Sequence, residues 1–281
     1  MLHDFHNAIV TAVSLTILFI GGNYTKVTDV SDARRLTPKL SSTLDQLHIN
    51  FCTMRFQGER GQSKAPIAVL KWFSHVPQLP ILRRLVIKAY TSDAKVAAHL
   101  FSKAKQTLLT LVLNYVGERF LLRHYDYSLA TDNFKGNIFT NLEGARQLKS
   151  VWVLCIASRL GEVADSLKKL EDVPLEEIHL HIPLCSETDS LEKLKPLDDH
   201  IHAGHFSQLH RMDLHMVQTR SLVEGHEIND GECEQAFESQ AQEVMRYCIH
   251  KSILRFRWLP EYERGLDDVF RREMSEKFLF S

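Results

Sequence analysis

The sequence predicts an α/β fold in which short parallel strands alternate with helices along one repeating array. Three observations support this prediction: an apolar pattern recurs along the chain, the segments between its copies have helical periodicity, and the composition is that of a folded protein. With 281 residues, 44% of them hydrophobic and 25% charged, the chain is long enough to bury a sizeable core. We expect a single domain over residues 1–281, in which 260–281 form a C-terminal capping or tail segment.

The recurring pattern consists of three apolar residues, separated first by two positions and then by one. It occurs eight times, as Leu15-Leu18-Ile20, Leu44-Leu47-Ile49, Leu82-Leu85-Ile87, Leu108-Leu111-Leu113, Leu148-Val151-Val153, Leu175-Ile178-Leu180, Leu209-Met212-Leu214 and Ile253-Phe256-Trp258. The last two apolar residues of each copy lie two apart on a strand, so both point to one face. This is the core motif of a leucine-rich repeat. Stacked coils of this kind bury a continuous core that no single coil can bury.

The array is irregular in two respects. The distance between copies ranges from 26 residues, between Leu82 and Leu108, to 44 residues, between Leu209 and Ile253, whereas regular repeats span about 20 to 29. The Asn or Cys that follows the motif in regular repeats occurs only in the first two copies. Those residues are Asn23 and Cys52. Chance matches would also be unevenly spaced, so a coincidental pattern is the alternative to a repeat.

The segments between the copies are predicted to be helical because their apolar residues follow helical spacing. They are Pro66–Val76, Ser92–Gln106, Leu160–Leu170, Ser190–Ala203 and Glu232–Ile249. Pro196 is expected to kink or restart the fourth of these helices. Strands that alternate with helices imply a parallel sheet. The predicted fold is therefore an irregular leucine-rich-repeat solenoid, or horseshoe, of about eight coils, with parallel strands on its concave face and helices outside.

Composition and charge argue against several classes of function. The chain has 34 Lys+Arg and 35 Asp+Glu, so nothing indicates a general nucleic-acid-binding surface. The apolar run Ile9–Ile20 is too short to span a bilayer, which needs about 20 residues, and no Lys or Arg precedes it as a signal peptide requires. The five cysteines are odd in number and widely spaced, which favours free thiols in an intracellular compartment, cytoplasmic or nuclear.

A protein partner is expected on the concave face, which the residues flanking the inward apolar positions would form. The predicted partner-binding residues are Trp152, His179, His181, Arg211, Asp213, His215 and Arg257. Trp and Arg are favoured as interface anchors, although Trp152 could instead be covered by a loop or pack against His179. Glu177 beside Arg211, and Asp213 beside Arg257 or His179, are expected to be cross-strand pairs on a solvated face.

The 15 histidines raise an alternative, a metal-binding protein or metal-dependent hydrolase. On adjacent strands His179, His181, Asp213 and His215 could bind zinc and activate a water. A second group (His200, His202 and His205) lies at a helix end but lacks the four-residue spacing of a helical metal pair. Solvated, partly protonated histidines are the interpretation we favour. No catalytic residue, metal site or cofactor is predicted, because the sequence contains none of the standard hydrolase, phosphate-binding or dinucleotide-binding motifs.

Three phrases resemble the leucine-rich-repeat portion of fungal F-box proteins: LRRLVI at Leu82–Ile87, FSQLHRMDL at Phe206–Leu214, and LRFRWLPEYERGLD at Leu254–Asp267. The resemblance implies a non-catalytic protein-protein interaction module that serves as the substrate-recognition part of a ubiquitin ligase receptor. Such proteins usually begin with an F-box, a short helical segment that docks onto the Skp1 adaptor, and nothing before Leu15 is long enough to be one. A Skp1-type adaptor is therefore an expected partner only if an F-box lies upstream. The alternative is a stand-alone repeat protein.

Overall fold

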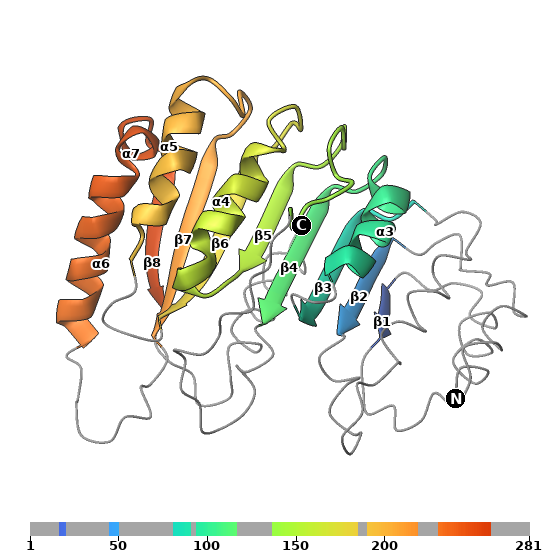
Figure 1. Ribbon diagram of the computed structural model, residues 1–281, viewed down its shortest axis with the longest axis horizontal. Helices are drawn as coiled ribbons and strands as arrows, with labels where there is room; N and C mark the ends of the chain where they lie inside the picture. Colours follow the sequence, from blue (N-terminus) through green and yellow to red (C-terminus); the bar gives the residue numbers. More distant parts are fainter. Residues whose placement is uncertain are drawn as a thin grey trace, which may run out of the picture.

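The computed structural model describes residues 17–20, 45–50, 81–90, 94–116, 137–184, 190–218 and 230–259. Its strands form one open parallel sheet in which each strand pairs with the next one in the chain (Figure 1). They are β1 (Ile17–Ile20), β2 (Gln46–Asn50), β3 (Arg84–Tyr90), β4 (Thr110–Val116), β5 (Ser150–Leu154), β6 (Glu177–Leu184), β7 (Arg211–Gln218) and β8 (Leu254–Leu259). The α/β class expected from the sequence is therefore confirmed.

The apolar motif predicted the pairing register of the first seven strands. Equivalent motif positions face one another across every pair, in the column Leu18, Leu47, Leu85, Leu111, Val151, Ile178 and Met212. The eighth copy was misaligned by two residues. Met212 pairs with Leu254 and Leu214 with Phe256, whereas the motif had matched them to Phe256 and Trp258. A shift of two residues keeps each side chain on its face of the sheet, so the apolar alternation cannot distinguish the two registers.

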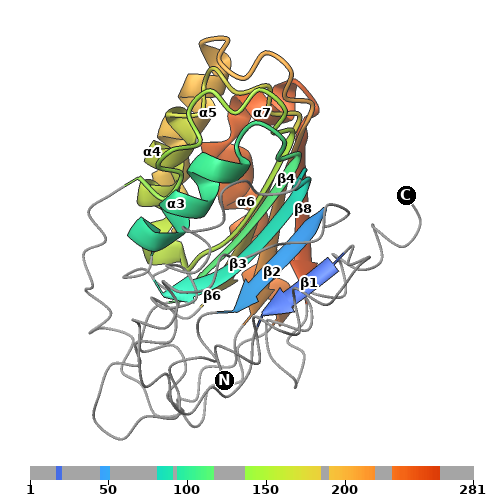
Figure 2. The same cartoon turned by 90° about the vertical axis from the view of Figure 1, so that its right-hand side faces the viewer.

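The helices of the described residues all lie on one face of the sheet (Figure 2). They are α3 (Ala94–Ala104), α4 (Leu160–Lys168), α5 (Lys195–His202), α6 (Asp230–Val244) and α7 (Arg246–His250), with short 3-10 turns at Ala157–Arg159 and Glu192–Leu194. Pro196 lies in the first turn of α5, so it restarts the helix as expected. Pro66–Val76, Asn23, Cys52 and residues 260–281 lie outside the described residues. No described helix has the length and apolar character needed to cross a membrane.

The helix predicted over Glu232–Ile249 is divided in two at Met245, whose backbone leaves the helical region with φ −109° and ψ 44°. The second piece, α7, begins there because Asp198 of α5 binds its first amide groups. The backbone N–H groups of Tyr247 and Cys248 each donate to one carboxylate oxygen of Asp198, both at 3.0 Å. A carboxylate at this position satisfies amides that have no partner within the helix. Asp198 thus fixes α7 against α5.

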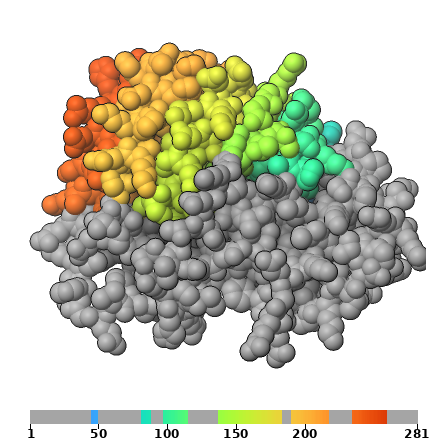
Figure 3. Space-filling model, in the orientation of Figure 1, coloured from blue at the N-terminus to red at the C-terminus, as the bar shows by residue number. Residues whose placement is uncertain are grey.

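The main core lies between the sheet and the helices. Apolar residues from both layers form one continuous buried cluster, which includes Leu111, Leu180, Phe101, Leu167 and Leu197. In the space-filling view, segments that follow one another in the chain form adjacent bands of colour across the helical layer (Figure 3).

Two cysteines whose side chains are described, Cys155 and Cys248, are buried free thiols, as the sequence predicted. Burial raises the pKa of both, that of Cys155 to about 12. These thiols are therefore expected to pack as small apolar residues and to react little.

Truncation of one inward strand residue should test this core. Leu180 is fully buried, so we expect Leu180→Ala to lower the free energy of unfolding by about 2–5 kcal/mol through lost burial and a cavity. Ile81, which is 64% exposed just before β3, supplies the matched control, and Ile81→Ala should change stability by less than about 0.5 kcal/mol. Urea unfolding measures both. Equal effects of the two substitutions would contradict the assigned core.

Candidate functional site

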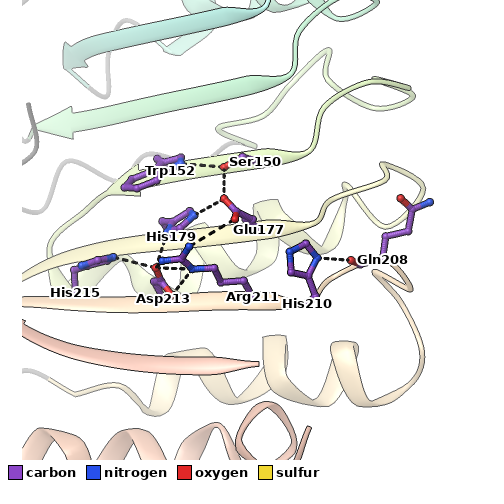
Figure 4. A network of polar contacts seen from close by, with 9 residues as sticks. All are labelled: Ser150, Trp152, Glu177, His179, Gln208, His210, Arg211, Asp213 and His215. Atoms are coloured by element: carbon purple, nitrogen blue, oxygen red, sulfur yellow. Dashed lines mark hydrogen bonds and ion pairs between the residues drawn. The ribbon is translucent and has the colours of Figure 1, made fainter. Parts of the chain in front are cut away.

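The pairing register gathers polar side chains on the face of the sheet opposite the helices. Trp152 of β5 lies opposite His179 of β6, which lies opposite Asp213 of β7. Residues two positions away on each strand share this face. We call the resulting group the polar cluster. It consists of Ser150, Trp152, Glu177, His179, His181, Arg211, Asp213 and His215, most of which are drawn in Figure 4.

Arg211 and Asp213 form the strongest contact of the polar cluster. They lie two residues apart on β7, so the guanidinium extends along the strand toward the carboxylate (Figure 4). Arg211 Nε donates to both oxygens of Asp213 at 3.0 Å, and Nη2 donates to Oδ2 at 2.6 Å. A forked, charge-assisted contact of this kind fixes both side chains more firmly than a single hydrogen bond does. Arg211 Nη1 also lies 3.7 Å from Glu177 Oε1.

His179 lies between two carboxylates. Its Nε2 is 3.0 Å from Glu177 Oε2 and its Nδ1 is 3.0 Å from Asp213 Oδ2. Together with Arg211, these side chains form a closed ring of polar contacts across β6 and β7. A buried carboxylate that contacts a cation costs far less free energy than an isolated buried ion.

The pKa of Asp213 reflects the side chains around it. Burial alone would raise it, but the close contacts with His179 and His215 and the hydrogen bonds from Arg211 outweigh burial and hold the pKa well below its ordinary value. His215 Nε2 lies 3.6 Å from Asp213 Oδ2. Asp213 is therefore ionised throughout the physiological pH range, although its side chain is fully buried.

Aromatic rings stack across the same strands. The ring of Trp152 lies 3.7 Å from that of His179 between centroids, at 15° between planes, and Trp152 Nε1 donates to Ser150 Oγ at 2.9 Å. The rings of His181 and His215 stack at 4.2 Å and 9°. Trp152 thus packs on His179, as one of our two interpretations of this residue anticipated.

The structure brings six of the seven predicted partner-binding residues together and leaves one apart. Trp152, His179, His181, Arg211, Asp213 and His215 all belong to the polar cluster, whereas Arg257 lies opposite His215 and is exposed. The expected pairing of Asp213 with Arg257 is wrong because the register of β8 places Arg255 opposite Asp213.

The prediction of solvated histidines is also wrong for this cluster. His179, His181 and His215 are at most 1% exposed. The sequence showed which residues share the face but carried no signal that this face is covered. The expected contacts of Glu177 with Arg211 and of Asp213 with His179 are present. The hydrogen bond from Trp152 to Ser150 was not foreseen, although the two-residue spacing already placed both on one face.

The polar cluster contains the residue types of a metal site. Ligand atoms of His179, Asp213 and His215 lie within 4.8 Å of one another. Two features disfavour a metal ion at this position. The guanidinium of Arg211 binds both oxygens of Asp213 and would repel a second cation, and both nitrogens of His179 already face carboxylates. The geometry favours a closed network of charges over the metal-dependent hydrolase considered from the sequence.

The second histidine group is divided by the structure. His200 and His205 stack on each other at 3.9 Å, whereas His202 contacts the edge of Tyr247 at 4.5 Å.

Comparisons with models of known protein families, with curated proteins and with solved structures found no match to this chain. The assignment of a function therefore depends on the residues described above.

The pKa of Asp213 leads to a testable pH dependence. A carboxyl group with a lowered pKa in the folded state stabilises the protein above its unfolded pKa of about 3.9, and this contribution is lost as the pH falls below about 4. We expect Asp213→Asn to lower the free energy of unfolding by about 3–5 kcal/mol near neutral pH, because Arg211 loses its charged partner. The difference from wild type should shrink toward about pH 3.

Urea unfolding at several pH values measures this difference. Asp172→Asn is the matched control, because Asp172 is exposed, and its pH profile should follow that of the wild type. A constant difference between wild type and Asp213→Asn at every pH would show that the ionisation of Asp213 does not stabilise the fold.

Proposed function

We propose that this chain is an irregular leucine-rich-repeat solenoid that acts as a non-catalytic protein-binding module. Modules of this kind form the substrate-recognition part of F-box ubiquitin-ligase receptors, and that is the role we propose. The observation that carries the proposal is the order of the strands. Eight parallel strands pair in chain order, and the helices of the described residues all lie on one side (Figures 1 and 2). Stacked coils have this topology, and the face without helices is the surface on which solenoid proteins bind partners.

The accessible part of this face lies toward β8. Side chains at its centre, such as Trp152 and His179, are buried, but Arg255 and Arg257 are exposed. Both lie on the helix-free face, because they pair in register with Asp213 and His215. No carboxylate of the described residues lies within ion-pair distance of either guanidinium. Two exposed arginines that lie two positions apart on one face of a strand suit an acidic segment of a partner protein.

The polar cluster supports this function by fixing the neighbouring strand. Arg211 and Asp213 hold each other in place on β7. β7 in turn pairs with β8, the strand that carries Arg255 and Arg257. A rigid platform reduces the entropy lost when a partner binds. In this proposal the polar cluster positions the binding surface and does not itself contact the partner.

Reversal of the two exposed charges tests the proposal. We expect Arg255→Glu combined with Arg257→Glu to abolish capture of acidic partner proteins, because attraction becomes repulsion. Quantitative mass spectrometry of proteins captured by wild type and variant measures the loss. The matched control is Arg83→Glu combined with Arg146→Glu, which reverses two exposed charges elsewhere on the chain. A partner set that both double variants retain equally, or that only the control loses, would contradict the assigned surface.

A further inference from the structure

A second group of metal-ligating side chains lies in the helical layer. Glu171 follows α4, His200 belongs to the last turn of α5, and His205 follows that helix. Their ligand atoms lie within 4.8 Å of one another. His200 Nε2 is 3.5 Å and His205 Nδ1 is 3.1 Å from the same oxygen of Glu171, Oε2. Packing of α4 against α5 thus brings together residues that are about thirty positions apart in the chain.

These distances suit a zinc ion. Nitrogen and oxygen ligands bind zinc at about 2.0–2.2 Å, which places tetrahedral ligands about 3.3–3.5 Å from one another. The two distances from Glu171 to the histidines are close to this separation. Two histidines and a glutamate also form one of the common ligand sets of zinc sites that keep a fourth position open. The two contacts of Glu171 therefore already have about the separation that a zinc site requires.

The ligand atoms are also available. His200 Nε2 is buried and makes no hydrogen bond to the described residues. The ring of His205 stacks parallel to that of His200, at 3°, so it must turn for its lone pair to meet the same ion. Its side chain is 41% exposed and has room to turn.

This group differs from the polar cluster in the side chains that contact its carboxylate. Both oxygens of Asp213 are bound by Arg211, whereas no arginine or lysine of the described residues forms an ion pair with Glu171. Lys168, three residues before Glu171, pairs with Asp165 at 2.6 Å. The carboxylate of Glu171 is therefore free to ligate a cation.

We propose that Glu171, His200 and His205 bind one Zn²⁺ ion, with water in the remaining position. The ion links the turn after α4 to the end of α5 and so ties together the coils that contribute β6 and β7. This site is independent of the protein-binding function proposed above, because it lies in the helical layer and not on the face that carries Arg255 and Arg257.

Metal titration of the full chain tests this site. We expect calorimetry to detect one Zn²⁺ ion per chain and Co²⁺ to give the visible absorption of a tetrahedral site. His205→Ala and Glu171→Gln should each weaken zinc binding by more than the roughly 10–100-fold that loss of a supporting residue costs. His202→Ala is the matched control, because this exposed histidine of the same helix points to Tyr247 and should leave binding unchanged.

Three outcomes would overturn the proposal. They are the absence of stoichiometric zinc binding by the wild type, full binding by His205→Ala, and loss of binding in His215→Ala while His205→Ala still binds. The last outcome would place the ion in the polar cluster. His205 is too exposed for its truncation to remove core packing, and circular dichroism confirms that each variant is folded. Zinc should also raise the Tm of the wild type but not that of His205→Ala.

Discussion

In-register stacking of the inward apolar residues holds the sheet and the helices together. Each strand supplies two such residues, and in β4 to β7 they are fully buried against the helices. Because side chains alternate across a strand, these columns also determine which residues reach the opposite face. A slip of one residue would place His179 and Asp213 in the apolar core and move Ile178 and Met212 to the opposite face. The positions of the polar cluster and of Arg255 and Arg257 follow from that register.

The opposite face is buried at its centre and is not a uniform binding surface. Val112, Trp152 and Leu154 form a small apolar cluster there, next to His179 and the charged carboxylate of Asp213. Buried charges are costly unless they compensate one another, and on β6 and β7 they do so through alternating signs. Among the described residues of this face, the exposed ones are Arg255 and Arg257 of β8. Burial at the centre of the face is the reason that the proposed contact surface lies near its end.

The sequence predicted what depends on local periodicity. Seven strands, their register and the position of α4 follow from apolar spacing alone. The register of β8 does not, because Leu254, Phe256 and Trp258 offer two equivalent frames. Burial of the histidines could not be predicted either, since it depends on what covers the face. The contact of Glu171 with His200 and His205 depends on how two helices pack, and no spacing within one segment encodes it.

The two histidine groups show how one neighbouring side chain decides the chemistry of a site. Both combine imidazoles with a carboxylate, and both join the coil of β6 to the coil of β7. On the sheet side Arg211 binds the carboxylate and supplies the positive charge, so the group is complete as folded. On the helix side no arginine or lysine of the described residues forms an ion pair with the carboxylate of Glu171. A divalent cation supplies the missing charge there, whereas on the sheet side it would have to displace an arginine.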